Sequence, residues 1–212
     1  MPSAVEIVQQ LAEIASGWRA LAVFWHIYFG SIVWLLVRAR PSRRTMGVLL
    51  ALPLLSVSSL AWKVGNPFNG SVFLLAAVAL SVIALKLPLS PLTIAPRWIT
   101  AMGVLMAGFG WAYPHFLDDT ASTLTYVYAA PTGLIPCPTL AMLIGLTLIV
   151  DGLRSRAWST LLVTLGLTYG VVGGAILEVA IDWLLVLGGV TLLIVTWRYT
   201  FPGGSHDSDQ RT

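Results

Sequence analysis

The sequence is poor in charge. Only 10% of its 212 residues are Asp, Glu, Lys or Arg, whereas a soluble domain carries about a quarter. Hydrophobic residues make up 57% of the chain, and the mean hydropathy is +0.85. This composition excludes a soluble globular domain and predicts a protein whose main solvent is the lipid bilayer.

Cysteine is almost absent as well, since Cys137 is the only one. A single thiol excludes an internal disulfide and a zinc site built from several thiolates. The sequence has no Walker A, HExxH, GxSxG or paired CxxC pattern, and these patterns mark common enzyme classes. Their absence favours a protein that is not an enzyme. The 12 Lys and Arg barely exceed the 9 Asp and Glu, so no nucleic-acid partner is expected.

Seven apolar segments are present, each near the length that crosses a bilayer core of about 30 Å as a helix. They cover residues 18–37, 46–62, 71–87, 98–113, 134–150, 158–175 and 183–198. Tryptophans and tyrosines lie near their ends, where aromatic rings favour the headgroup region. No carboxylate lies inside any segment, so the acidic relays of many pumps are not expected. The pattern predicts an all-α, up-and-down bundle of about seven transmembrane helices.

The two ends of the chain differ from this bundle, which we assign to residues 18–200. Residues 3–16 place apolar side chains at helical spacing, with Val5, Val8, Leu11, Ala12 and Ala15 on one face. We therefore expect residues 1–17 to form an amphipathic helix that lies on the membrane surface. Residues 201–212 are polar, and we expect a disordered tail.

Basic residues predict the orientation, because cytoplasmic loops of membrane proteins are enriched in Lys and Arg. With the N-terminus outside and the C-terminus in the cytoplasm, only Arg19 and Lys63 lie outside. The other ten of the 12 basic residues are then cytoplasmic: Arg38, Arg40, Arg43, Arg44, Lys86, Arg97, Arg154, Arg156, Arg198 and Arg211. The charge distribution thus supports an odd number of spans independently of hydropathy.

The fifth segment is unusual, because prolines and a glycine crowd residues 126–138. Proline removes a backbone donor and clashes with the preceding turn, so we expect a regular helix only from about Pro138 onward. A helix of residues 139–150 would begin inside the membrane and point its positive end at a buried site. Cys137 would lie there and, with Pro136 and Thr139, could bind a small anion or a soft metal, or Cys137 could be a reactive thiol. The alternative is a kinked span from about Ser122, in which Cys137 only packs.

His26 lies in the middle of the first segment, on a stripe with Ala22 and Gly30. Small residues allow close approach of another helix, so this face is expected to point inward. An ionisable group within the membrane is a candidate ligand-binding residue. The alternative is a neutral imidazole that bonds to a carbonyl oxygen of the next helix.

The outer loop of residues 113–119 brings further polar groups toward Cys137. Tyr113 is a candidate ligand-binding residue, and His115, Asp118 and Cys137 together could hold a metal ion such as Zn²⁺ or copper, since these are suitable ligand types. A metal ion is therefore the cofactor we consider. The alternative is an ordinary solvated loop.

The second half of the chain also resembles an uncharacterised family of bacterial multi-spanning membrane proteins, a domain of unknown function with a Pro-Cys-Pro element. The matching residues are 130–133 (Ala-Pro-Thr-Gly), 136–139 (Pro-Cys-Pro-Thr) and the apolar stretch 141–150. The resemblance begins near Gly108 and covers about half of the chain. It implies a multi-pass protein of the bacterial inner membrane and draws attention to Cys137, but it assigns no activity.

Three functions remain open at this point. The first is transport or binding of a small solute or soft metal at an outward-facing site near the broken fifth helix. The second is a haem-, quinone- or lipid-handling enzyme or redox subunit that uses His26 and His115. The third is an accessory subunit of a membrane complex, or a homo-oligomer, that packs through the glycines of residues 166–174.

Overall fold

A computed structural model describes residues 4–117 and 124–198, and these residues form helices joined by turns without any β-strand. The elements are α1 (Ala4–Gly17), α2 (Arg19–Arg38), α3 (Arg43–Lys63), α4 (Pro67–Lys86), α5 (Arg97–Trp111), α6 (Thr125–Ala129), α7 (Pro136–Ile149), η1 (Asp151–Arg154), α8 (Arg156–Val171), η2 (Val172–Ile176), η3 (Ala180–Asp182) and α9 (Trp183–Arg198). The all-α prediction is confirmed.

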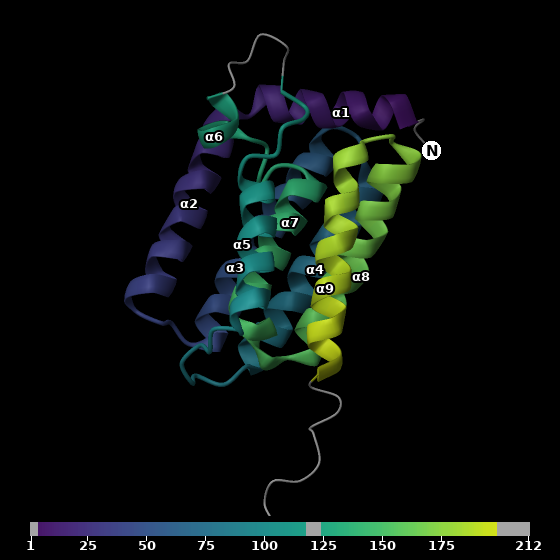
Figure 1. The fold of residues 1–212 in the computed structure, drawn as a ribbon. Helices are drawn as coiled ribbons and strands as arrows, with labels where there is room; N and C mark the ends of the chain where they lie inside the picture. The colour runs from purple at the N-terminus through teal and green to yellow at the C-terminus, as the bar shows by residue number, and fades with distance from the viewer. Residues whose placement is uncertain (1–3, 118–123, 199–212) are drawn as a thin grey trace, which may run out of the picture.

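The long helices run up and down in one bundle, and α1 crosses one end of it (Figure 1). A helix occurs at each of the seven predicted apolar segments. Five are long and apolar enough to cross a membrane: residues 19–38, 43–63, 67–86, 156–176 and 180–197. The remaining two, α5 and α7, have 15 and 14 residues, which is about 21 to 22 Å of helix.

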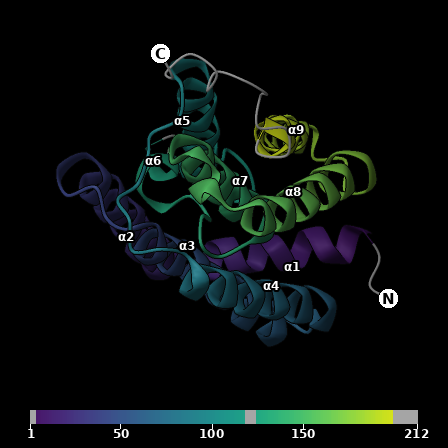
Figure 2. The ribbon, with the colours of Figure 1, turned by 90° about the horizontal axis from the view of Figure 1, so that it is seen from below.

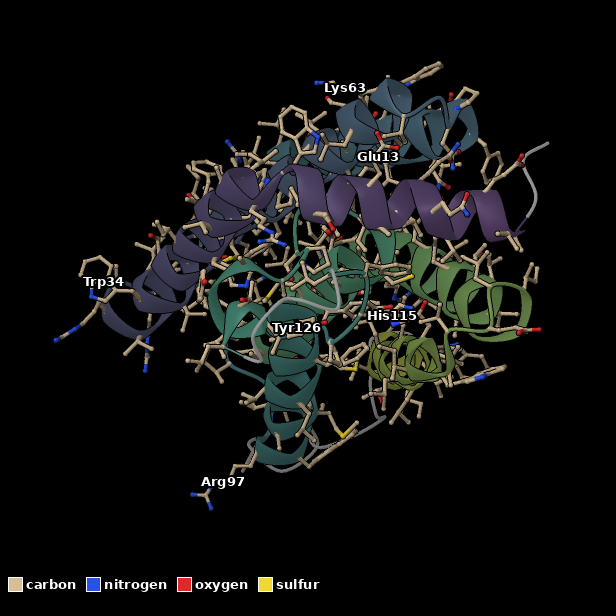
Figure 3. All side chains as sticks on the ribbon, turned by 90° about the horizontal axis from the view of Figure 1, so that it is seen from above. Glu13, Trp34, Lys63, Arg97, His115 and Tyr126 are labelled. Carbon is tan, nitrogen blue, oxygen red and sulfur yellow. The ribbon has the colours of Figure 1, made fainter. Side chains whose placement is uncertain are left out.

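Large apolar side chains cover the outside of the bundle. Val37 is 76% exposed, Leu75 69% and Trp34 64%, and Trp34 projects away from the neighbouring helices (Figure 3). An apolar surface of this extent is unfavourable in water but not in hydrocarbon. The described structure is therefore compatible with an integral membrane protein.

Helix α7 is the centre of the bundle, because every side chain from Pro136 to Leu148 is buried. It packs closely on α5 through glycines on both helices. A Cβ added to Gly110 of α5 would lie 2.5 Å from the backbone nitrogen of Met142, and one added to Gly145 of α7 would lie 2.4 Å from that of Ala107. Such backbone contact excludes any larger residue there.

The glycines of α8 also face inward. A Cβ at Gly166 would lie 2.6 Å from the side chain of Ile144 on α7, and one at Gly170 would lie 2.9 Å from the backbone of Val186 on α9. The close packing predicted for this face is thus made within the chain. Gly166 and Gly170 are therefore occupied by contacts within the chain, and docking of a partner protein stays a hypothesis.

Helix α1 lies between the pair α3–α4 and the group α7–α9 when the bundle is viewed along its length (Figure 2). Leu11, Ile14 and Ala15 of α1 are buried, whereas Val5 is 66% exposed. A helix is present where the amphipathic helix was predicted. It packs one face on the bundle, and its position on the membrane surface stays a prediction.

Basic residues gather at the end of the bundle opposite α1. This end holds the last residues of α2, α4 and α9 and the first residues of α3, α5 and α8 (Figure 1), and Arg97 extends away from the fold there (Figure 3). At the α1 end, the Lys63 ammonium lies 4.2 Å from the ring centroid of Trp18. Within the described residues, the basic residues thus gather at one end of the bundle, whereas Arg211 lies outside them and the orientation in the membrane stays a prediction.

Candidate functional site

A buried carboxylate, that of Asp182, lies at the α1 end of the bundle. The Tyr113 hydroxyl donates a hydrogen bond of 2.7 Å to Oδ1 of Asp182, and Cys137 is a neighbour of the same carboxylate. The side chains are almost inaccessible, with exposed fractions of 0% for Tyr113, 1% for Asp182 and 7% for Cys137. These three residues, called the carboxylate cluster below, come from three distant parts of the sequence.

Asp182 enters the bundle because α8 ends in an unusual way. The α-helix continues as a π-helical turn, η2, and Glu178 then adopts a left-handed backbone conformation with φ of 58°. Backbone hydrogen bonds from Val179 N to Gly173 O and from Asp182 N to Val179 O, both 2.9 Å, hold this turn. Inserted π-turns often occur at functional sites in other proteins.

Gly173 makes room for the carboxylate. A Cβ at this position would lie 2.0 Å from Oδ2 of Asp182, so no other residue fits while Asp182 keeps its place. Asp182 lies just before the seventh apolar segment, and no carboxylate was expected inside any span. That expectation is wrong, because the turn folds Asp182 inward, where its carboxylate lies against Gly173 and bonds to Tyr113. Gly173 is the one residue in the sequence that could have indicated a buried Asp182. Close packing between helices explained a glycine at this position equally well.

Cys137 is held by the start of α7. The helix begins at Pro136, in the first-turn position that tolerates a missing N–H. The Thr139 hydroxyl donates to Ile135 O at 2.6 Å and accepts from Gly133 N at 2.8 Å, which fixes the irregular chain before the helix. The predicted break is confirmed and the helix starts two residues earlier than expected. Both hydrogen bonds of the Thr139 hydroxyl are therefore made to residues 133–135, directly before α7, where they stabilise the irregular chain.

Gly133 is essential to the break. Its φ of +80° is unfavourable for other residues, and an added Cβ would lie 2.3 Å from the ring of Trp25 on α2. Trp25 in turn donates from Nε1 to the hydroxyl of Ser56 on α3 at 3.1 Å. The irregular segment before α7 is therefore clamped between α2 and the core.

Cys137 also lines a cavity of about 470 Å³ at the α1 end. Its walls are contributed by α1, the start of α4, the start of α7, and α8 with η2, and most of them are apolar. The lining residues used below are Ile7, Leu11, Asn69, Val72, Phe116, Pro136, Cys137, Leu165 and Tyr169. Of the predicted ligand-binding residues, only Pro136 and Cys137 line this cavity.

Two polar residues of the cavity wall were missed by the sequence analysis. The Tyr169 hydroxyl on α8 donates to Oδ1 of Asn69 on α4 at 2.8 Å. This bond joins the two helices at the cavity wall, which also includes the polar residues Asn66, Thr168 and Cys137. Asn69 lies at a helix start and Tyr169 within a predicted span, so neither position is unusual in the sequence.

Tyr113 lies two residues beyond α5 and is fully buried. Burial, and secondarily the charges of Cys137 and Asp182, raise the pKa of the Tyr113 hydroxyl well above its ordinary value. It is therefore a neutral donor to Asp182 throughout the physiological pH range. Tyr113 supports the carboxylate, and it is not among the residues that line the cavity.

His26 is occupied by backbone carbonyls. Its Nδ1 lies 2.8 Å from Ala22 O in the same helix, and its Nε2 lies 2.9 Å from Trp111 O at the end of α5. The imidazole also packs edge-on against the Trp111 ring, with centroids 4.8 Å apart. This is the structural alternative considered for His26: it ties α2 to α5 and is not part of the cavity wall.

The metal hypothesis concerns His115, Asp118 and Cys137. His115 is exposed, and Asp118 lies outside the described residues. Among residues 4–117 and 124–198, no group of three or more His, Cys, Asp and Glu side chains is arranged to hold a metal ion. His115 is close enough to Asp182 to favour the ionised carboxylate. The described part of the chain thus leaves His115 exposed and Cys137 buried, and it does not bring them together as a metal centre.

Comparisons with known proteins add no relative: no protein-family model, no curated protein and no solved structure matches the chain.

Proposed function

We propose that the chain is a seven-helix membrane protein that binds a lipid-like molecule, meaning an apolar chain with a small polar end, in the cavity at its outer end. The observation that carries this proposal is the cavity itself: about 470 Å³ of space with a mostly apolar lining. Ligand pockets for small molecules have volumes of about 300 to 1,000 Å³. The cavity is therefore large enough for a ligand and poorly suited to a hydrated one.

The apolar lining favours the second hypothesis of the sequence analysis over the first. A hydrated solute or a metal ion loses its water on entering an apolar cavity and needs several polar groups in return. Here the polar groups are few, and Asn69 and Tyr169 already bond to each other. An alkyl or isoprenoid chain instead gains about 0.8 kcal/mol per buried CH₂ group.

The polar end of the ligand has two partners available. The Cys137 thiol lines the cavity beside Pro136, and the Asn69–Tyr169 pair lies on the wall formed by α4 and α8. A carbonyl or hydroxyl group could bond to either. A fatty acyl ester and a quinone share this chemistry, and extraction of the bound molecule distinguishes them.

Helix α1 closes the cavity on the outer side. Ile7 and Leu11 of α1 contribute to the lining, and Leu11 is buried. An amphipathic helix at the membrane interface is well placed to cover a site that lipid molecules reach from the bilayer.

For the topology, we propose seven crossings with the N-terminus outside and the C-terminus in the cytoplasm, in the inner membrane of a bacterium. The shorter helices α5 and α7 run in the middle of the bundle with the longer ones (Figure 1). The basic end opposite α1 is then cytoplasmic, as the positive-inside rule requires. The resemblance to a bacterial membrane family supports the location.

The orientation is tested with single cysteines in a Cys137→Ala background. Lys63→Cys at the end of α3 is expected to react with a membrane-impermeant maleimide in intact cells. Arg38→Cys at the end of α2 is expected to react only after the cells are opened. The reverse result would overturn the orientation, and labelling of both from outside would overturn the crossing by α3, which lies between the two positions.

Binding is tested by purifying the protein in a mild detergent and recording its native mass spectrum, followed by organic extraction. We expect one lipid-like molecule per chain. Leu165→Trp fills the cavity from α8, where Leu165 is 7% exposed, whereas the matched control Val171→Trp changes an α8 residue that is 44% exposed. The first variant should lose the ligand and the second should keep it. A wild-type protein without any bound organic molecule would refute the proposal.

A further inference from the structure

Resting on the binding function proposed above, we propose that Asn66 selects the ligand of the cavity, and that it selects an uncharged lipid with a carbonyl oxygen. The observation behind this is a nearly buried amide group with an unused N–H donor on the wall of a cavity whose described lining carries no charge. An ester and a quinone ring both supply such an oxygen.

Asn66 directly precedes α4, and only 6% of its surface is exposed. Its Oδ1 accepts a hydrogen bond of 3.1 Å from the backbone nitrogen of Asn69, so it caps the helix. Because a backbone N–H bonds to the oxygen of an amide and not to its nitrogen, this contact fixes which end of the side chain is Nδ2. Among the described residues, no atom accepts a hydrogen bond from Nδ2. Since Asn66 lines the cavity, this donor is left for a ligand.

Helix capping does not explain the choice of asparagine at position 66. The cap uses only Oδ1, and Asp, Ser or Thr supply an equivalent oxygen. Asp would also add a favourable negative charge at the start of the helix. A buried donor without a partner costs free energy, and a ligand oxygen bonded to Nδ2 would remove this cost. The amide nitrogen of Asn66 is therefore explained by binding and not by folding.

Asn69 adds a second donor to the same wall. Its Oδ1 accepts from the Tyr169 hydroxyl at 2.8 Å, which leaves its Nδ2 without a partner in the described part of the chain. Asn66 and Asn69 both line the cavity, and the oxygen atoms of both amides are already engaged. The two amides thus offer N–H donors to a ligand, which favours an acceptor such as a carbonyl oxygen over a group that must donate.

A charged head group is unfavourable in this cavity. None of the described residues that line it is Asp, Glu, Lys, Arg or His, so an ion would lose its water without gaining a counter-ion. A phosphate or carboxylate group would also approach the carboxylate cluster, because Asp182 lies directly behind the lining residue Gly173. The part of the ligand that enters the cavity is therefore uncharged.

The exposed residues of the cavity wall indicate where such a lipid enters. Phe68 of α4 is 66% exposed, Thr168 of α8 is exposed as well, and both line the cavity. Because α4 and α8 are long and apolar enough to cross a membrane, their outer faces meet lipid in the proposed topology. The cavity thus opens toward the bilayer between α4 and α8, and a neutral lipid can reach Asn66 without passing through water.

The first test compares probes with similar alkyl chains on the full-length protein in lipid nanodiscs. Methyl laurate and decylubiquinone carry uncharged carbonyl groups, dodecane has no polar group, and dodecyl phosphate and dodecyltrimethylammonium are charged. Calorimetric titration, with empty nanodiscs as the blank, measures the dissociation constants. At least one carbonyl probe should bind about tenfold more tightly than dodecane, which is the gain expected from one buried hydrogen bond.

The charged probes should bind more weakly than that carbonyl probe. Whichever of methyl laurate and decylubiquinone binds more tightly identifies an ester or a quinone as the source of the carbonyl group. If dodecane or a charged probe binds as tightly as both carbonyl probes, or more tightly, the proposal is overturned.

The second test removes the donor of Asn66 and keeps the helix cap. Asn66→Asp retains an oxygen for the backbone nitrogen of Asn69, but at about pH 8 the new carboxylate has no proton to donate. The preference for the carbonyl probe over dodecane should fall by about tenfold. Ser42→Ala is the matched control, because the Ser42 hydroxyl caps α3 through a bond of 3.1 Å to Thr45 N, and it should keep the preference. An unchanged preference in Asn66→Asp would overturn the proposal.

The comparison of probes on the wild-type protein needs no variant, so it applies even if Asn66→Asp does not fold. Leu165→Trp separates this proposal from the binding function on which it rests, because Leu165 lines the cavity. If every probe binds Leu165→Trp as tightly as the wild type, the cavity is not the binding site and the binding function fails. If Leu165→Trp loses the probes but the wild type does not prefer a carbonyl probe to dodecane, only the role of Asn66 fails.

Discussion

The hydroxyl of Tyr113 donates a 2.7 Å hydrogen bond to Asp182, a residue 69 positions later in the chain. This bond joins the end of α5 to the start of α9 and provides a buried carboxylate with a donor that cannot easily lose its proton. Removing either group should therefore leave the other without its partner in the interior.

Tyr113→Phe should destabilise the protein by about 1.5 to 3 kcal/mol, the cost of losing a hydrogen bond to a charged group in the interior. Thermal unfolding in detergent measures this. Tyr128→Phe is the matched control, because Tyr128 is 54% exposed, and it should leave the unfolding temperature unchanged. An equal effect of the two variants would show that the Tyr113 bond contributes nothing to stability.

Tyr113 should also make the stability of the protein depend on pH in the alkaline range. Burial raises the pKa of Tyr113 far above its ordinary value of 10.0, so folding favours its protonated form. Its contribution to stability is full below pH 10 and decreases as the pH rises above 10, because only the unfolded chain then loses the proton. The unfolding temperature should drop more steeply above pH 10 for the wild type than for Tyr113→Phe. Parallel curves would contradict this.

Gly173→Ala should be among the most damaging single changes. The added Cβ would lie 2.0 Å from Oδ2 of Asp182, and relieving such an overlap in a packed interior costs about 3 kcal/mol. Gly108→Ala is the control, since nothing lies within 4 Å of its added Cβ. That variant should be as stable as the wild type or up to about 1 kcal/mol more stable. The unfolding temperatures of both variants in detergent measure this difference, and equal values for the two variants would contradict the prediction.

His26→Phe should lower stability without affecting ligand binding. The change leaves Trp111 O without its imidazole partner, which costs about 1 to 3 kcal/mol. Because His26 is not part of the cavity wall, the amount of co-purified lipid per folded chain should equal that of the wild type. Loss of the lipid from a folded His26→Phe protein would restore His26 as a binding residue.

Access to Cys137 should depend on α1. Leu11→Ser weakens the buried face of α1 next to the cavity, so N-ethylmaleimide should modify Cys137 faster than in the wild type, by about tenfold if opening becomes about 1.4 kcal/mol easier. Val5→Ser changes a residue of α1 that is 66% exposed and should not alter the rate. Equal rates in all three proteins would show that α1 does not cover the thiol.

Much of the fold was predictable, because hydropathy and proline are local signals. Each apolar segment corresponds to a helix, and the break before α7 follows from the prolines around Cys137. The interior position of His26 also followed from its small neighbours. These inferences needed only the residues within one or two helical turns.

The site was less predictable, because its members meet through tertiary structure. Asp182 is an ordinary residue at the end of an apolar segment until the π-turn at Gly173 folds it inward. The bond between Asn69 and Tyr169 spans 100 positions, and no local pattern indicates such pairs. The packing of α1 on the bundle was not predicted for a related reason, since its buried residues, Leu11, Ile14 and Ala15, meet partners that are distant in the sequence.

The short central helix has a consequence for how the protein is made. Its 14 residues provide about 21 Å of helix, less than the hydrocarbon thickness of about 30 Å. If α7 were exposed to lipid, the bilayer would have to become thinner around it, which costs free energy. Inside the bundle α7 contacts other helices instead of lipid, so the difference in length costs little. Because α8 and α9 follow α7 in the sequence, they leave the ribosome after it, and we expect α7 to reach its buried position only when they are present. A chain truncated after residue 150 should therefore not hold α7 stably in the membrane.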